Sequence, residues 1–264
     1  MITNTKILFC AILKVVNADC ICDIGSRDGD QSLLFRQLCP EATVLAFEAN
    51  PINFKAMSAD PRLRDGRIEL FPFAVSNARG TARFHVTDVD YTDPEANKGT
   101  SSLLPREDFP VKYTVEVETR RIDVFTLTQF SQAIAIGLWI DVEGAEYSVI
   151  EGMSGIKDRV VAVQVETAKV PLRQGQKTLA ELTVLMESQG FALCGSNIRR
   201  TADWGDVVYV NHRVIRDLGF RFSMCKLRGY MGLWIPVDHA AELLKTRYPA
   251  AYRFFRRLYL KFGT

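Results

Sequence analysis

One stretch near the N-terminus, residues 20–51, constrains the fold of this chain more than any other. A short apolar run ends at Ile24 and opens a loop with two glycines. An amphipathic segment follows, and a second apolar run then ends at Glu48. This order of strand, tight loop, helix, strand and acid is typical of a site for an adenosine-bearing cofactor at the carboxyl edge of a parallel sheet. The acid can accept hydrogen bonds from the hydroxyls of a ribose.

The residue types and glycine spacing of the loop indicate which cofactor it favours. A dinucleotide loop, G-x-G-x-x-G, uses closely spaced glycines to admit a pyrophosphate. Here Asp23, Gly25 and Gly29 give D-x-G-x-x-x-G, Arg27 stands where a glycine would be needed, and the third glycine is missing. S-adenosyl-L-methionine has no phosphate and needs only one close backbone approach, so the loop favours this methyl donor over NAD. A strand-to-helix turn without a ligand is the remaining alternative.

Several short motifs occur in a characteristic order along the chain. They are D-I-G-S-R-D-G at 23–29, F-E-A-N-P at 47–51, A-V-S-N at 74–77, G-T-S-S-L at 99–103 and I-D-V-E-G-A-E at 140–146. Together they resemble the FkbM-type S-adenosylmethionine-dependent methyltransferases over roughly 20–212. The motif at 140–146 is the most specific, and Arg27, Ala49 and Asn77 depart from the residues usual in the family.

The alternation of predicted strands and helices favours a three-layer α/β sandwich with a mostly parallel sheet. Apolar patterns predict further strands at 68–76, 82–88, 113–123, 138–140 and 160–165, helices at 145–153 and 178–189, and a hairpin from 191–193 and 207–210. Residues 90–110 are expected to form a long loop, of the kind that often closes over a site. The resemblance implies a Rossmann-like class I methyltransferase fold with an antiparallel last strand.

We divide the chain into an N-terminal lead-in (1–19), a methyltransferase domain (20–212) and a basic, aromatic C-terminal helical extension (213–264). Within the extension, 240–262 is predicted to be helical. Packing of its aromatic side chains on the domain is favoured over contact with a membrane surface or an acidic partner.

Composition excludes several classes of function. The formal net charge of +2 is too small to indicate nucleic-acid binding, and no apolar run is long enough to span a membrane. Lys14 interrupts the apolar start, so we expect no cleaved signal peptide. The six cysteines form no C-x-x-C pair, which favours reduced thiols in a cytoplasmic protein. The oligomeric state stays open.

The loop, the acid at the second strand end and the resemblance together suggest a cofactor-binding set. Its members are Asp23, Gly25, Ser26, Arg27, Gly29, Glu48, Ala49, Asn50, Ala74, Val75 and Asp141.

The acids after the strand at 138–140 are the candidate catalytic residues. Asp141 follows the strand directly, and Glu143 and Glu146 lie in the next turn. A hydroxyl is a poor nucleophile at neutral pH, so a base assists its methylation, and Asp141 is our first choice. The same carboxylates could instead stabilise the donor's positive charge, cap the helix, or bind Mg²⁺ or Ca²⁺. We favour a site without metal.

Other polar residues are candidates for contact with the substrate. His85 lies on a predicted strand and is a further catalytic candidate, although a lone histidine is more often structural. Ser101 and Ser102 in the long loop, and Glu166 after the strand at 160–165, are expected to bind the acceptor.

The resemblance implies O-methylation of a sugar or natural-product hydroxyl, with a small-molecule or carbohydrate acceptor as partner. Two alternatives belong to other classes of protein. One is a regulatory protein that binds the donor without turnover, against which the retained acids argue. The other is an NAD-dependent enzyme, against which the missing glycine and the absence of a Tyr-x-x-x-Lys pair argue.

Overall fold

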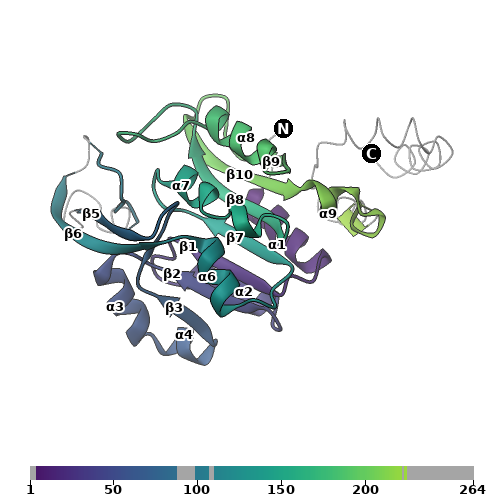
Figure 1. Cartoon of the computed structure of the whole chain (residues 1–264), viewed down its shortest axis with the longest axis horizontal. Coiled ribbons are helices and arrows are strands. Elements are labelled where there is room, and N and C mark those ends of the chain that lie inside the picture. Colours follow the sequence, from purple (N-terminus) through teal and green to yellow (C-terminus); the bar gives the residue numbers. More distant parts are fainter. Residues whose placement is uncertain (1–3, 88–98, 107–109, 222, 225–264) are drawn as a thin grey trace.

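The central element is a seven-stranded sheet with the order β3-β2-β1-β7-β8-β10-β9. Figure 1 shows it in a computed structural model that describes residues 4–87, 99–106, 110–221 and 223–224. The strands are β1 (Cys20–Ile24), β2 (Thr43–Phe47), β3 (Ile68–Phe71), β7 (Ile136–Ile140), β8 (Val160–Ala168), β9 (Phe191–Ser196) and β10 (Trp204–Asn211). β10 runs antiparallel to both of its neighbours, whereas the other pairings are parallel. The expected mostly parallel sheet with an antiparallel last strand is confirmed.

Helices pack on both faces of this sheet and complete three layers (Figure 1). α6 (Ile122–Gln129), α7 (Glu146–Glu151) and α8 (Leu179–Ser188) contribute apolar side chains to the core on one face. The core on the other face receives side chains from α1 (Thr5–Val15), α2 (Asp30–Leu38), α3 (Pro51–Ala59), α4 (Pro61–Asp65) and α9 (His212–Arg216). Buried β1 and β2 residues belong to both cores in alternation, as the two-residue period of a strand requires. The Rossmann-like class I methyltransferase fold is therefore confirmed.

The segment 68–76, expected as one strand, is divided between two sheets. β3 ends at Phe71, and Pro72 cannot donate a ladder hydrogen bond. Ala74–Val75 then forms β4 in a smaller sheet with the order β4-β6-β5, in which β5 is Gly80–Thr87 and β6 is Val111–Arg120. The expected strand at 113–123 is also shorter, because α6 begins at Ile122. The small sheet extends beyond the carboxyl edge of the main sheet on the β2 side (Figure 1).

The lead-in contains a helix, α1, that the sequence patterns did not reveal. Asn4 caps it by accepting a hydrogen bond from the Ile7 amide at 3.0 Å. Leu8, Phe9 and Ile12 are almost fully buried, and Phe9 packs edge-on against Trp139 of β7 with ring centroids 5.7 Å apart. Burial of such side chains is worth about 1.5–3 kcal/mol each, so α1 contributes substantially to the core.

The C-terminal extension is described only at its start, where it forms α9. The predicted helix at 240–262 lies outside the described residues. Among the residues that the structure describes, no helix combines the length and hydrophobicity needed to cross a bilayer.

Candidate functional site

A recess of about 540 Å³, partly open to solvent, lies at the carboxyl edge of the sheet beside β1, β2 and β7. The small sheet and the loop 99–106 form its other walls. The residues predicted from the sequence that line it are Gly25, Arg27, Glu48, Ala49, Ala74, Val75, Ser101, Asp141 and Glu143. Further lining residues that the sequence did not single out as ligand contacts include Asn53, Phe73 and Phe84, together with Leu103 and Val142 of the motifs at 99–103 and 140–146.

Gly25 lets two loops meet at the floor of the recess. Its φ is +86°, and a Cβ at this position would lie 1.8 Å from the carbonyl oxygen of Asp141. The Gly25 amide donates to the Phe47 carbonyl at 2.9 Å, which ties the loop to β2 as well. A larger residue would force the loop away from β7, so this glycine is needed for the close approach that the sequence predicted.

Three residues in or next to the loop do not line the recess: Asp23, Ser26 and Gly29. Their contacts are to the protein interior and hold the loop in place. The buried Asp23 carboxylate accepts hydrogen bonds from the hydroxyls of Ser26 at 2.7 Å and Ser32 at 2.5 Å. Burial raises the pKa of Asp23 to about 6, although both hydroxyls act in the opposite direction. A Cβ on Gly29 would collide with Leu63 of α4. These residues therefore brace the loop whose other members line the recess.

Glu48 stands at the end of β2 with both carboxylate oxygens facing backbone amides. Oε2 accepts from the Arg27 amide at 2.7 Å, and Oε1 accepts from the Asn50 amide at 2.6 Å. The side chain is buried, and this burial raises its pKa to about 7. Asn53 also bonds the Glu48 side chain and lines the recess. An ionised carboxylate has about four acceptor positions, of which the two amides and the Asn53 side chain use three, so one remains for a ribose hydroxyl and a second becomes free if Asn53 turns away.

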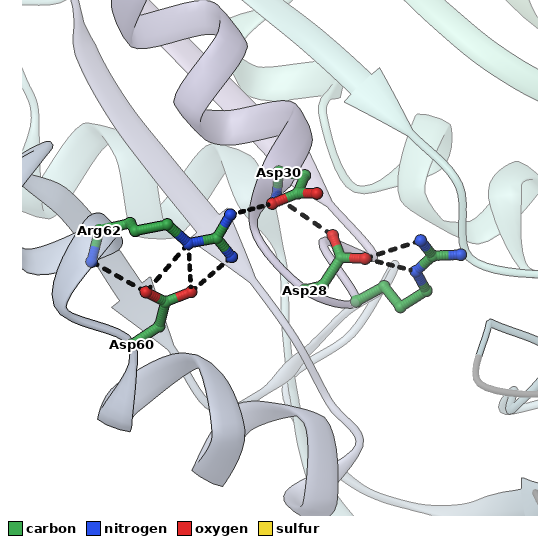
Figure 2. Close-up of polar contacts among 5 residues, drawn as sticks. Asp28, Asp30, Asp60 and Arg62 are labelled. Atoms are coloured by element: carbon green, nitrogen blue, oxygen red, sulfur yellow. Dashed lines mark hydrogen bonds and ion pairs between the residues drawn. The ribbon is translucent and has the colours of Figure 1, made fainter. Parts of the chain in front are cut away.

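The side chain of Arg27 forms an exposed pair beside the loop. Its Nη2 lies 2.7 Å from Asp28 Oδ2, and the other Asp28 oxygen accepts from the Asp30 amide at 3.1 Å. Figure 2 shows this group next to Arg62, whose guanidinium bridges Asp60 and Asp30. These pairs join the start of α2 to α4. Because they are solvent-exposed, they contribute little stability and mainly orient the loop.

Three carboxylates meet where β7 and β8 reach the carboxyl edge. One oxygen from each of Asp141, Glu143 and Glu166 lies within 4.8 Å of the others. Burial, together with a smaller contribution from repulsion by Glu143, raises the pKa of Asp141 to about 8. The pKa of Glu166 is also raised, first by burial and then by Asp141. Protein surrounds Asp141, yet its side chain reaches solvent through the recess, so a ligand can touch it.

Asp141 and Glu166 form a hydrogen-bonded acid pair. Two like charges this close cannot both ionise easily, so the pair holds on to its protons at neutral pH and Asp141 releases its proton near pH 8. Such a pair can accept a proton from a bound hydroxyl near pH 8. Glu166 lies inside β8, which continues to Ala168 and is longer than the expected strand at 160–165.

Arg173 was not anticipated from the sequence, and it holds the acidic turn against the loop 99–106. Its Nη2 pairs with Glu143 Oε2 at 2.6 Å and donates to the Thr100 carbonyl at 2.8 Å. Nη1 donates to the Leu104 carbonyl at 3.3 Å. Glu143 has a φ of +57°, a conformation unusual for a side chain of this kind. Arg173 compensates the charge of Glu143, so Asp141 is, of the three acids, the one that lines the recess without a cationic partner among the described residues. Glu166, expected to bind the acceptor, does not line the recess and lies beside Asp141.

Other predicted residues lie outside the lining of the recess. Glu146 is buried and accepts from the Gly144 amide at 2.8 Å, so it braces the turn. Ser102 donates to the Glu143 carbonyl at 2.8 Å, and Asn50 caps α3 through Ile52. Phe84 lines the recess, and because strand side chains alternate, His85 points to the other face, where Nδ1 lies 3.4 Å from Thr114 Oγ1.

The acids also define where a divalent cation could be held. Carboxylate oxygens suit Mg²⁺ and Ca²⁺, and Asp141, Glu143 and Glu166 are the residues positioned to provide them. This set differs from the one expected from the sequence, because the Glu146 carboxylate is used by the Gly144 amide. Arg173 on Glu143 competes with a cation for one of these oxygens.

The raised pKa values predict that the protein loses stability as the pH rises through about 6 for Asp23 and about 7 for Glu48 and Glu146. In this range the folded state holds protons that the unfolded chain has already released, so removing them favours unfolding. Melting temperatures at constant ionic strength should therefore be lower at pH 8 than at pH 6. Asp23→Asn, which keeps an acceptor for both serines, should reduce the fall. A melting temperature that rises over this range would contradict the assignment.

The strand order, the glycine approach at Gly25 and the acid at the end of β2 define a class I methyltransferase. A family model described as the methyltransferase FkbM domain matches residues 23–193, and the chain belongs to this family. The protein is thus an S-adenosylmethionine-dependent methyltransferase.

The chain is also similar to individual proteins. It is 30% identical over 179 residues to the 2-O-methyltransferase NoeI of Sinorhizobium fredii, covering 64% of this chain and 71% of NoeI. Among solved structures, a putative O-methyltransferase from Nostoc punctiforme has a TM-score of 0.43 at 11% identity, covering 80% of this chain and 57% of the other. An O-methyltransferase family protein from Burkholderia thailandensis has a TM-score of 0.41 at 10% identity, covering 78% and 55%. The strand order, not these low scores, defines the fold.

Proposed function

We propose that this protein transfers a methyl group from S-adenosylmethionine to a hydroxyl of a sugar or natural-product acceptor. The observation that carries the proposal is the convergence of Gly25, Glu48 and Asp141 on one recess. The name of the relative NoeI, a 2-O-methyltransferase, supports a hydroxyl as the methylated group.

The residues of the recess fit the donor. Glu48 retains an acceptor position for a ribose hydroxyl and can offer a second by exchanging its bond from Asn53, and Gly25 leaves the backbone accessible for the methionine end. Val75, Phe84 and Leu103 form an apolar wall that suits the adenine base. When bound, S-adenosylmethionine supplies a methyl group activated by a sulfonium, and the C–S electron pair stays on sulfur.

Asp141 is the proposed general base. Its carboxylate reaches the recess, and its raised pKa lies near the value that general-base catalysis at mild pH requires. The proton leaving the acceptor hydroxyl passes to Asp141, and Glu166 stabilises the protonated pair by its hydrogen bond. Because Arg173 compensates its charge, we assign Glu143 to holding the acidic turn against the loop 99–106. We assign Glu146 to bracing the turn.

Calorimetry with S-adenosylmethionine and with NAD⁺, each titrated into the full chain, tests the proposal. We expect binding of the methyl donor with a stoichiometry of one and no heat from NAD⁺. Binding of NAD⁺ alone would overturn the proposal. The same protein is then assayed for S-adenosylhomocysteine formation with and without EDTA. Activity that disappears with EDTA and returns with Mg²⁺ would make the three acids a metal site, and donor binding without turnover on a panel of hydroxyl acceptors would favour a regulatory role.

A further inference from the structure

Trp204 is a large aromatic side chain left exposed at the edge of the sheet where the acids lie. It is the first residue of β10 and pairs with Ala168, the last residue of β8. The residue is 57% exposed to solvent. Exposure of an indole forgoes much of the free energy that its burial would contribute. A solvent-exposed tryptophan at this end of β8 and β10, outside the lining of the recess, therefore calls for an explanation.

The backbone that presents Trp204 is firmly held. The ammonium of Lys169 donates to the carbonyls of Arg199 at 2.9 Å, Arg200 at 3.3 Å and Ala202 at 2.6 Å. The Lys169 amide donates to the Asp203 carbonyl at 2.6 Å. These bonds order the turn immediately before β10, so the indole is displayed on a rigid support. Rigid presentation is what a binding surface needs, because little conformational entropy is lost on contact.

The pairing of β10 with β8 brings Trp204 to the same face as the acid pair. Asp206 is two residues after Trp204, so these two side chains are on the same face of β10. Asp206 pairs with Glu166, and the Glu166 side chain is therefore on this face as well. Glu166 in turn reaches Asp141. Diagonal neighbours on adjacent strands lie about 7–8 Å apart, which is the separation expected between Trp204 and Glu166.

The strands also differ in length at this edge. β7 ends at Ile140, which pairs with Val165, whereas β8 continues to Ala168. The last residues of β8 and the first residues of β10 therefore extend beyond the end of β7, where Asp141 follows the strand. Trp204 lies on this extended part of the sheet, on the side of the acids away from the donor residues of β1 and β2.

We propose that Trp204 is the platform on which the acceptor lies and that the acceptor is a carbohydrate. This inference rests on the proposed function. A pyranose ring has a face of C–H groups, which are attracted to the electron-rich face of an indole, and a rim of hydroxyls. With the ring on Trp204, rim hydroxyls reach the oxygens of Glu166 and Asp141. A purely apolar acceptor would cover these carboxyl groups without hydrogen bonds, at a considerable desolvation cost.

The test uses methyl pyranosides of glucose, galactose, mannose, fucose and rhamnose as probes, with cyclohexanol as the comparison ligand. The protein carries ¹⁵N-labelled indoles and is saturated with S-adenosylhomocysteine. The Trp204 signal is assigned by its loss in Trp204→Phe. We expect at least one pyranoside, and not cyclohexanol, to shift the Trp204 signal while the Trp139 signal stays in place. If no pyranoside shifts it, the proposal is overturned.

Variants then separate stacking from general packing. Trp204→Leu keeps an apolar side chain without a ring and should weaken pyranoside binding by about tenfold. Trp204→Phe should recover part of the loss, and Leu218→Ala, which changes an exposed residue of the extension, should have no effect. Pyranoside affinity unchanged in Trp204→Leu would also overturn the proposal. Donor affinity is measured for the wild type and for every variant. If the wild type does not bind the donor, the proposed function is contradicted. If donor binding is intact, a change in pyranoside affinity is assigned to Trp204.

Discussion

Asp141→Asn is expected to lower turnover by about 10²–10⁴-fold, the contribution of a typical general base. Asparagine occupies nearly the same volume but cannot take the proton from the acceptor hydroxyl. The raised pKa of Asp141 also predicts that the rate of the wild-type enzyme increases with pH up to about 8, because the base must lose its own proton first. The measurement is S-adenosylhomocysteine formation across pH with a saturating acceptor.

Two controls accompany the Asp141 variant. Its melting temperature and donor affinity should stay close to those of the wild type, because the main-chain contact from the Asp141 amide to the Ile24 carbonyl does not involve the side chain. Asp65→Asn, an equivalent change at an exposed position of α4, should leave turnover intact. Turnover near the wild-type rate in Asp141→Asn would rule out the role of base.

Glu48→Ala is expected to weaken donor binding by at least about tenfold. The variant removes two charge-assisted hydrogen bonds to the ribose, each worth roughly 1.5–3 kcal/mol. Because the pKa of Glu48 is raised to about 7 by burial, wild-type affinity should also fall as the pH drops below this value and the carboxylate becomes protonated. Calorimetric titration with S-adenosylmethionine at several pH values measures both effects.

Glu48→Ala also leaves the amides of Arg27 and Asn50 without their acceptor, so its stability is measured alongside its affinity. Glu69→Ala on the neighbouring strand β3 is the matched control, since Glu69 is exposed and lies outside the recess. Donor affinity in a folded Glu48→Ala variant equal to that of the wild type would exclude the ribose contact.

The parts of the site that could be predicted are those encoded within one strand and the loop that follows it. Gly25 and Glu48 follow β1 and β2, and Asp141 follows β7, so a strand-and-loop pattern was enough to place all three at one edge. The same reasoning assigned Asp23 and Ser26 to the ligand, although Asp23 is turned inward to serine hydroxyls. Sequence spacing locates a residue on a loop but does not say which way its side chain points.

The sequence by itself determined the class of fold, the methyl-donor loop and the acid at the end of β7, because strand periodicity and glycine spacing are local properties of the chain. Only the tertiary structure decided that Arg173 compensates Glu143, that Glu166 lies beside Asp141, and that Trp204 shares a face of the sheet with Glu166. These relations join residues far apart in the chain. They depend on strand order, register and the extra length of β8, which arise when the whole sheet packs between its two layers of helices.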